Sequence, residues 1–68
     1  MDDKTKKRLV LLSRTIKNSQ DKVKNYTNQL VTEKNPTNKN KLTLKIEIEK
    51  IRILLKTKEG ELTILRNQ

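Results

Sequence analysis

The sequence predicts an all-α fold, an antiparallel two-helix hairpin of the coiled-coil type that dimerises into a four-helix bundle. Two observations predict it. Apolar residues recur at alternating three- and four-residue steps in both halves of the chain, and one polar cluster, "EKNPTNKN" at 33–40, separates the halves. A chain of 68 residues makes a single domain of marginal stability. Because the chain has no Cys and no His, association is the remaining way to stabilise it.

Residues 3–34 form the first predicted helix. Its apolar stripe has one polar member, Ser19. Asp2 and Asp3 suit the positive end of the helix dipole, so the helix is expected to begin there. The stripe consists of Leu9, Leu12, Ile16, Ser19, Val23, Tyr26 and Leu30.

The loop is predicted at residues 35–39, because Asn, Pro and Thr favour turns and Pro36 disfavours a helical conformation at Asn35. A second helix is predicted at residues 40–66. Its seam keeps the rhythm of the first helix, and six of its seven positions are apolar. The seam positions are Leu44, Ile48, Ile51, Leu55, Lys58, Leu62 and Leu65.

The second half also permits an α+β alternative, a long N-terminal helix followed by a C-terminal β-hairpin. Ile and Thr are abundant there, and "KEGE" at 58–61 suits a hairpin turn between strands at 51–57 and 61–66. Gly60 inside a helix would cost about 1 kcal/mol relative to Ala. Residues 42–66 therefore have two interpretations.

The pairing of the two stripes favours the helical hairpin. If the loop folds two helices antiparallel, facing seam positions should be symmetric about the turn. All seven pairs are symmetric about Thr37. The pairs are Leu9 with Leu65, Leu12 with Leu62, Ile16 with Lys58, Ser19 with Leu55, Val23 with Ile51, Tyr26 with Ile48, and Leu30 with Leu44.

A second apolar stripe on residues 40–66 predicts association. Leu42, Ile46, Ile53 and Ile64 fall within about 40° of one another, nearly opposite the predicted seam. A two-helix hairpin buries one face of each helix, so this stripe is expected to be an interface. A second copy is the simplest partner, with two second helices at the centre of a four-helix bundle, and a different protein is the alternative.

The charge predicts a polyanionic partner. Seventeen Lys and Arg against eight Asp and Glu give a formal net charge of +9. One aromatic residue, Tyr26, is too few for base stacking, so contacts to a nucleic-acid backbone are expected. Between residues 4 and 28 there are eight bases and one acid, Asp21. These bases are the candidate nucleic-acid-binding residues: Lys4, Lys6, Lys7, Arg8, Arg14, Lys17, Lys22 and Lys24.

The residues needed for catalysis are scarce. Without His or Cys the chain lacks the usual base and thiol nucleophile, and Ser13 and Ser19 have no evident activating base. We therefore expect no enzyme, no catalytic residue, no metal site and no cofactor.

The localisation and the type of protein are predicted from composition. The longest apolar run, "LVLL" at 9–12, is far short of the roughly 20 residues that span a bilayer, so a cytoplasmic protein without a membrane span is expected. The abundance of Lys, Asn, Ile and Thr suits an accessory regulator of a phage or plasmid. The sequence thus predicts a small basic binding module whose first helix contacts nucleic acid. The alternative is an interaction, scaffold or inhibitor protein that uses the second apolar stripe.

Overall fold

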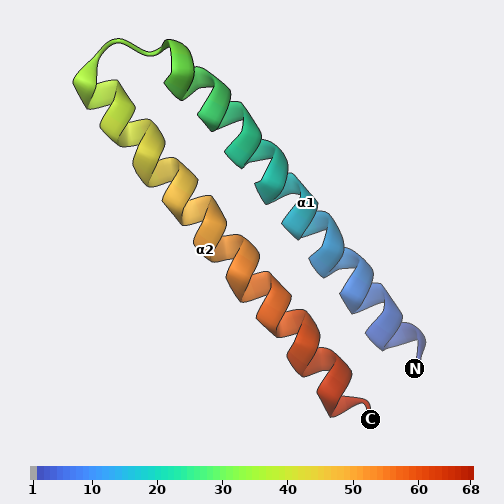
Figure 1. Cartoon of the computed structure of the whole chain (residues 1–68). Coiled ribbons are helices and arrows are strands. Elements are labelled where there is room, and N and C mark those ends of the chain that lie inside the picture. The colour runs from blue at the N-terminus through green and yellow to red at the C-terminus, as the bar shows by residue number, and fades with distance from the viewer. Residues whose placement is uncertain (1) are drawn as a thin grey trace.

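The computed structural model describes residues 2–68 as two long helices that lie side by side (Figure 1). α1 spans Asp3–Thr32 and α2 spans Pro36–Arg66. The helices run antiparallel, so both termini lie at one end of a rod whose Cα atoms extend 50 × 14 × 11 Å. The predicted all-α hairpin is confirmed. The α+β alternative is wrong, because the residues expected as strands belong to α2.

The start of α1 is held by the predicted acidic residues. Asp2 has an extended backbone, and its carboxylate accepts a hydrogen bond of 2.7 Å from the backbone N–H of Thr5. This bond satisfies one of the backbone donors that every helix leaves free in its first turn. Asp3 lies within that turn, where a negative charge favours the helix dipole.

The loop is shorter than predicted. It contains residues 33–35, and α2 begins at Pro36, four residues before the expected start at 40. Asn35 caps α2 by accepting from the backbone N–H groups of Thr37 and Asn38. Pro36 then occupies the first helical position, where its fixed φ suits the helix and its missing N–H is not needed. "NP" is therefore a helix start and not the middle of a turn.

The inner face of α1, the face that packs against α2, is the predicted one. Leu12 and Ser19 are buried, and the other members of the predicted stripe are half-buried. Thr5 extends this face by one step toward the N-terminus and is 6% exposed. Periodicity therefore placed every member of this stripe correctly.

The predicted inner face of α2 is wrong. Its six apolar seam residues are 45% to 65% exposed, whereas the residues predicted to point outward lie toward α1. Leu42 is 7% exposed, Ile46 and Ile53 are half-buried, and Ile64 near the end of the helix is 39% exposed. The observed inner face of α2 consists of Leu42, Ile46, Glu49, Ile53, Lys56, Gly60 and Thr63.

Side-chain contacts across the helices define the actual pairing. The Ser19 hydroxyl donates to the Glu49 carboxylate at 3.3 Å, and the Thr5 hydroxyl donates to the Asn67 side-chain carbonyl at 3.0 Å. Ser19 had been paired with Leu55 in the symmetric arrangement about Thr37. The observed partner, Glu49, lies six positions nearer the loop, and at about 100° per residue this places it about 120° around α2 from Leu55.

Gly60 is part of this pairing. A Cβ atom at Gly60 would lie 3.9 Å from Leu12 Cδ1 and 4.0 Å from Leu9 Cδ2, so two leucines of α1 lie over the glycine. The pairing predicted from the sequence sets Leu12 against Leu62 and gives Gly60 no partner on α1. Gly60 therefore belongs to the interior of a helix and not to a β-turn.

Candidate functional site

The eight candidate bases of α1 are all exposed, and they are distributed around more than one side of the helix. At about 100° per residue, five of them fall within about 100° of arc on the side opposite Leu12 and Ser19. We call these five the outer basic face: Lys6, Lys7, Arg14, Lys17 and Lys24. Lys4, Arg8 and Lys22 lie toward the flank of α1 and are not part of it.

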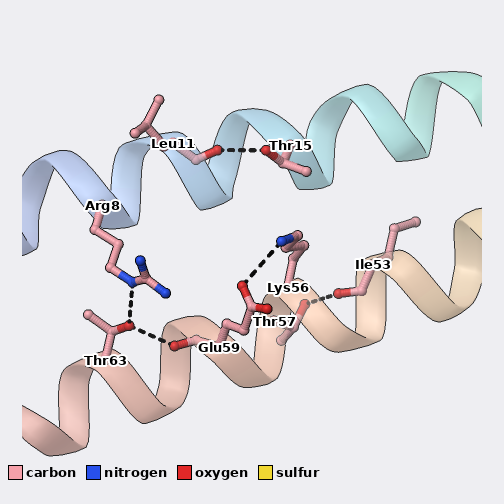
Figure 2. A network of polar contacts seen from close by, with 8 residues as sticks. All are labelled: Arg8, Leu11, Thr15, Ile53, Lys56, Thr57, Glu59 and Thr63. Carbon is pink, nitrogen blue, oxygen red and sulfur yellow. Dashed lines mark hydrogen bonds and ion pairs between the residues drawn. The ribbon is translucent and has the colours of Figure 1, made fainter.

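The densest part of the outer basic face surrounds two aliphatic residues. Lys6, Lys7 and Arg14 line one shallow depression together with Val10 and Leu11. Val10 is 50% exposed and Leu11 is 61% exposed, and Leu11 points away from α2 in Figure 2. The depression therefore presents three cations around an apolar floor.

A second basic cluster lies where the chain ends meet. Lys4 and Arg8 of α1 and Arg66 of α2 line a depression with Thr5, Thr63 and Asn67. Arg66 was missed by the sequence analysis, because it lies 58 positions after Arg8 and only antiparallel packing brings the two together. The predicted bases at 4–8 are thus divided between this cluster and the outer basic face.

Arg8 is the candidate base that donates a hydrogen bond to a side chain of α2. Its Nε donates to the Thr63 hydroxyl at 3.3 Å, and that hydroxyl donates to the Glu59 backbone carbonyl at 2.8 Å (Figure 2). This chain of hydrogen bonds holds the Arg8 guanidinium against α2.

The ion pairs lie on one of the two helices. Among residues 2–68, the three ion pairs all lie within α2: Glu49 with Arg52, Glu59 with Lys56, and Glu61 with Lys58. Figure 2 shows the second of these pairs between two neighbouring turns of α2. None of the eight α1 bases pairs with a carboxylate in this part of the chain. The bases of α1 therefore have no ion-pair partner, whereas three of the eight bases of α2 are paired with a carboxylate on the same helix.

The one buried carboxylate has a structural role. The Glu49 side chain is 6% exposed and accepts hydrogen bonds from Ser19, and from Arg52 at 2.8 and 3.1 Å. Buried side-chain polar atoms of the described residues all have partners. Because Glu49 is satisfied from both helices, it fixes their pairing.

Asp2 is the group whose titration is altered. Its pKa lies below the usual value, chiefly because the carboxylate accepts the hydrogen bond from the Thr5 backbone N–H. The charged form of Asp2 is therefore the form that caps α1.

Tyr26, the single aromatic residue, is half-buried against α2. The Lys45 ammonium lies 5.7 Å from the centre of its ring, within the range of a cation–π contact. Tyr26 is thus engaged by α2, and a single aromatic residue cannot supply the several platforms that base stacking needs.

Two features are absent from residues 2–68. No group of three or more His, Cys, Asp or Glu side chains is arranged to hold a metal ion. Neither helix combines the length and apolar character that a membrane crossing needs.

The exposed apolar surface of the hairpin lies mainly on α2. The residues predicted as an interface are covered by α1, with the exception of Ile64, and the predicted seam takes their place on the surface. We call this surface the outer apolar stripe: Leu44, Ile48, Ile51, Leu55, Leu62 and Leu65. Its members are spaced as in a coiled coil over three heptads.

No protein-family model, no curated protein and no solved structure matches the chain. Inference of function therefore rests on the geometry and charge of the chain itself.

Proposed function

We propose that this protein is a small, non-enzymatic module that binds the phosphate backbone of nucleic acid through the outer basic face of α1. One observation carries the proposal: the exposed bases of α1 have no carboxylate partner within residues 2–68, while the ion pairs of this region lie on α2. An array of unpaired cations along one helix is the electrostatic footprint of a polyanion-binding surface.

The form of the outer basic face supports backbone contacts. Its bases run from Lys6 to Lys24, about 27 Å along the helix at about 1.5 Å per residue. Lys and Arg heads at this spacing can contact several phosphates on one side of a duplex. The half-buried Tyr26 does not provide base stacking. Binding with little dependence on base sequence follows.

The proposal includes the setting and assembly expected from the sequence. We place the module in the cytoplasm, as an accessory regulator of a phage or plasmid, and as a homodimer. A hairpin with only Leu12 and Leu42 as buried hydrophobic residues among those described gains little stability from its own core. Association would add the apolar burial that the hairpin lacks.

A salt titration tests the proposal. Binding to a labelled DNA duplex and to an RNA duplex of the same length would be measured by fluorescence anisotropy between about 50 and 200 mM salt. If the five bases of the outer basic face each contact a phosphate, log affinity should fall against log salt with a slope of roughly −4.5. No binding to either duplex at the lowest salt would end the nucleic-acid proposal.

Matched variants locate the site. Changing Lys6, Lys7 and Arg14 to Gln should reduce the slope to roughly −2, because three contacts are lost. Changing Lys39, Lys41 and Lys50 to Gln removes the same charge from exposed residues of α2 and should have a clearly smaller effect. Equal losses in the two variants would mean that binding follows net charge and not the outer basic face.

A second candidate function rests on the outer apolar stripe. Its exposure favours an interaction, scaffold or inhibitor protein that binds another protein through α2. Such binding would change little with salt, since apolar burial is not screened by ions. The same titration therefore separates the two candidates.

A further inference from the structure

The outer apolar stripe is a full helix face without a covering element. Its six members lie between Leu44 and Leu65, about 32 Å along the helix at about 1.5 Å per residue. They are between 45% and 65% exposed. Monomeric proteins rarely leave a continuous apolar surface of this length in water.

The spacing of the stripe suits a helical partner. Steps of three and four residues over three heptads allow side chains to insert between those of a second straight helix. Lys58 is the one polar member of the heptad series, and its Nζ lies 3.3 Å from Glu61 Oε2 on the same helix. That ion pair draws the ammonium to the edge of the stripe.

The charges beside the stripe fit a second copy of α2 in parallel orientation. One edge carries Glu47, Leu54 and Glu61, and the other edge carries Lys45, Arg52, Glu59 and Arg66. In parallel helices, a residue on the first edge faces the residue about five positions later on the second edge of the partner. Glu47 then meets Arg52 of the second copy, and Glu61 meets Arg66 of the second copy. By symmetry each of these attractions forms twice.

An antiparallel arrangement is less complementary. It would place the edge with Glu47 and Glu61 against the same edge of the second copy. Glu47 would then face Glu61 of the second copy at both ends of the interface, and on the other edge Arg52 would face its own counterpart, so that Lys45 with Glu59 is the one attractive pair. The parallel arrangement has one unfavourable layer, in which the two Lys58 residues approach each other. The long side chains can extend outward from that layer, and a polar layer also selects register and orientation.

We propose that two copies of the hairpin associate in parallel through the outer apolar stripe. This inference rests on the self-association proposed above and specifies its surface and direction. The inner and outer faces of α2 are about 160° apart at about 100° per residue, so the four helices form a nearly flat row, α1–α2–α2–α1. The two outer basic faces then lie on the two far edges of the dimer, where each can bind a polyanion.

Single cysteines test the arrangement, because the chain has no Cys of its own. In the parallel dimer, a cysteine replacing Leu44 lies beside its counterpart, within the Cα separation of about 5.5 Å that a disulfide requires. The same holds for Leu65→Cys at the other end of the stripe. Antiparallel copies would hold either pair of cysteines about 30 Å apart. Lys17→Cys on α1 is the matched control.

Sedimentation velocity should show that the unmodified chain is a dimer. The variants Leu44→Cys and Leu65→Cys should oxidise rapidly to disulfide-linked dimers, and Lys17→Cys should not. Ile51→Lys should weaken the dimer on the order of 100-fold, while circular dichroism stays helical because Ile51 is 65% exposed in the hairpin. A monomer at high micromolar concentration would overturn self-association altogether. A dimer in which neither cysteine at 44 nor at 65 links would overturn only the parallel arrangement.

Discussion

A helix of a hairpin usually buries its more apolar face, whereas α2 buries its more polar face and exposes its more apolar one. The inner face includes a carboxylate, an ammonium, a glycine and a threonine, whereas the outer stripe is apolar at six of seven heptad positions. α1 packs on the more polar of the two. The contacts that α1 makes explain the choice. Ser19 donates to Glu49, and Arg8 donates to Thr63. Leu9 and Leu12 lie over Gly60. Specific pairing decides the inner face, which leaves the more apolar face exposed.

The largest expected difference in stability between substitutions on the two faces of α2 is that between Leu42 and Leu44. Leu42→Ala should destabilise the hairpin by about 3 kcal/mol, because Leu42 is 7% exposed and its removal leaves a cavity against α1. Leu44→Ala should cost less than about 0.5 kcal/mol in the monomer, because Leu44 is 59% exposed. Urea unfolding at low protein concentration, where association is absent, measures both. Equal losses would contradict the assignment of inner and outer faces.

A second comparison uses two glutamates. Glu49→Ala should cost about 2 kcal/mol, because it removes the acceptor shared by Ser19 and Arg52 inside the interface. Glu47→Ala, on the outer side of α2, should change hairpin stability by less than about 0.5 kcal/mol. The midpoint of urea unfolding under the same dilute conditions decides between them. If Glu49→Ala unfolds no earlier than Glu47→Ala, the buried cluster does not hold the pairing.

A substitution at Gly60 tests how closely the inner faces of α1 and α2 approach each other. Gly60→Ala should stabilise the hairpin by about 1 kcal/mol, because Ala favours the helix and its Cβ would meet the two leucines of α1 at ordinary contact distance. An increase in thermal midpoint is the expected observation. A decrease would show that Leu9 and Leu12 lie closer to the α2 backbone than the structure places them.

The smallest effect concerns the open end of the inner face, where Asp2 caps the turn that carries Thr5. Asp2→Ala should lower the thermal midpoint at neutral pH, and Asp2→Asn should restore most of the loss, since Asn also caps helices. Because the pKa of Asp2 is lowered in the folded state, its stabilisation is present above the unfolded value and disappears as the pH falls through the folded value. The difference between Asp2→Ala and the unmodified chain should therefore shrink in acid. A difference independent of pH would mean that the carboxylate charge is not involved.

Much of the candidate site could be predicted from local sequence and some could not. The bases of α1 and the inner stripe of that helix follow from composition and periodicity, which depend on neighbours within one or two turns. Arg66, which joins Lys4 and Arg8 at the end of the rod, depends on packing between distant segments. The loop was predicted too long because "NP" was interpreted as a turn, although Asn as a cap followed by Pro is also a strong helix start.

The sequence by itself determined that there are two helices, that α1 carries one apolar stripe, and that the chain is strongly basic. It also determined that α2 has two apolar stripes at coiled-coil spacing. Only the tertiary structure decided which stripe meets α1. Both stripes satisfy helical periodicity, and pairings two residues apart present opposite sides of α2. The choice depends on individual contacts across the helices, such as Ser19 with Glu49 and Leu12 over Gly60, and spacing along the chain does not encode such contacts.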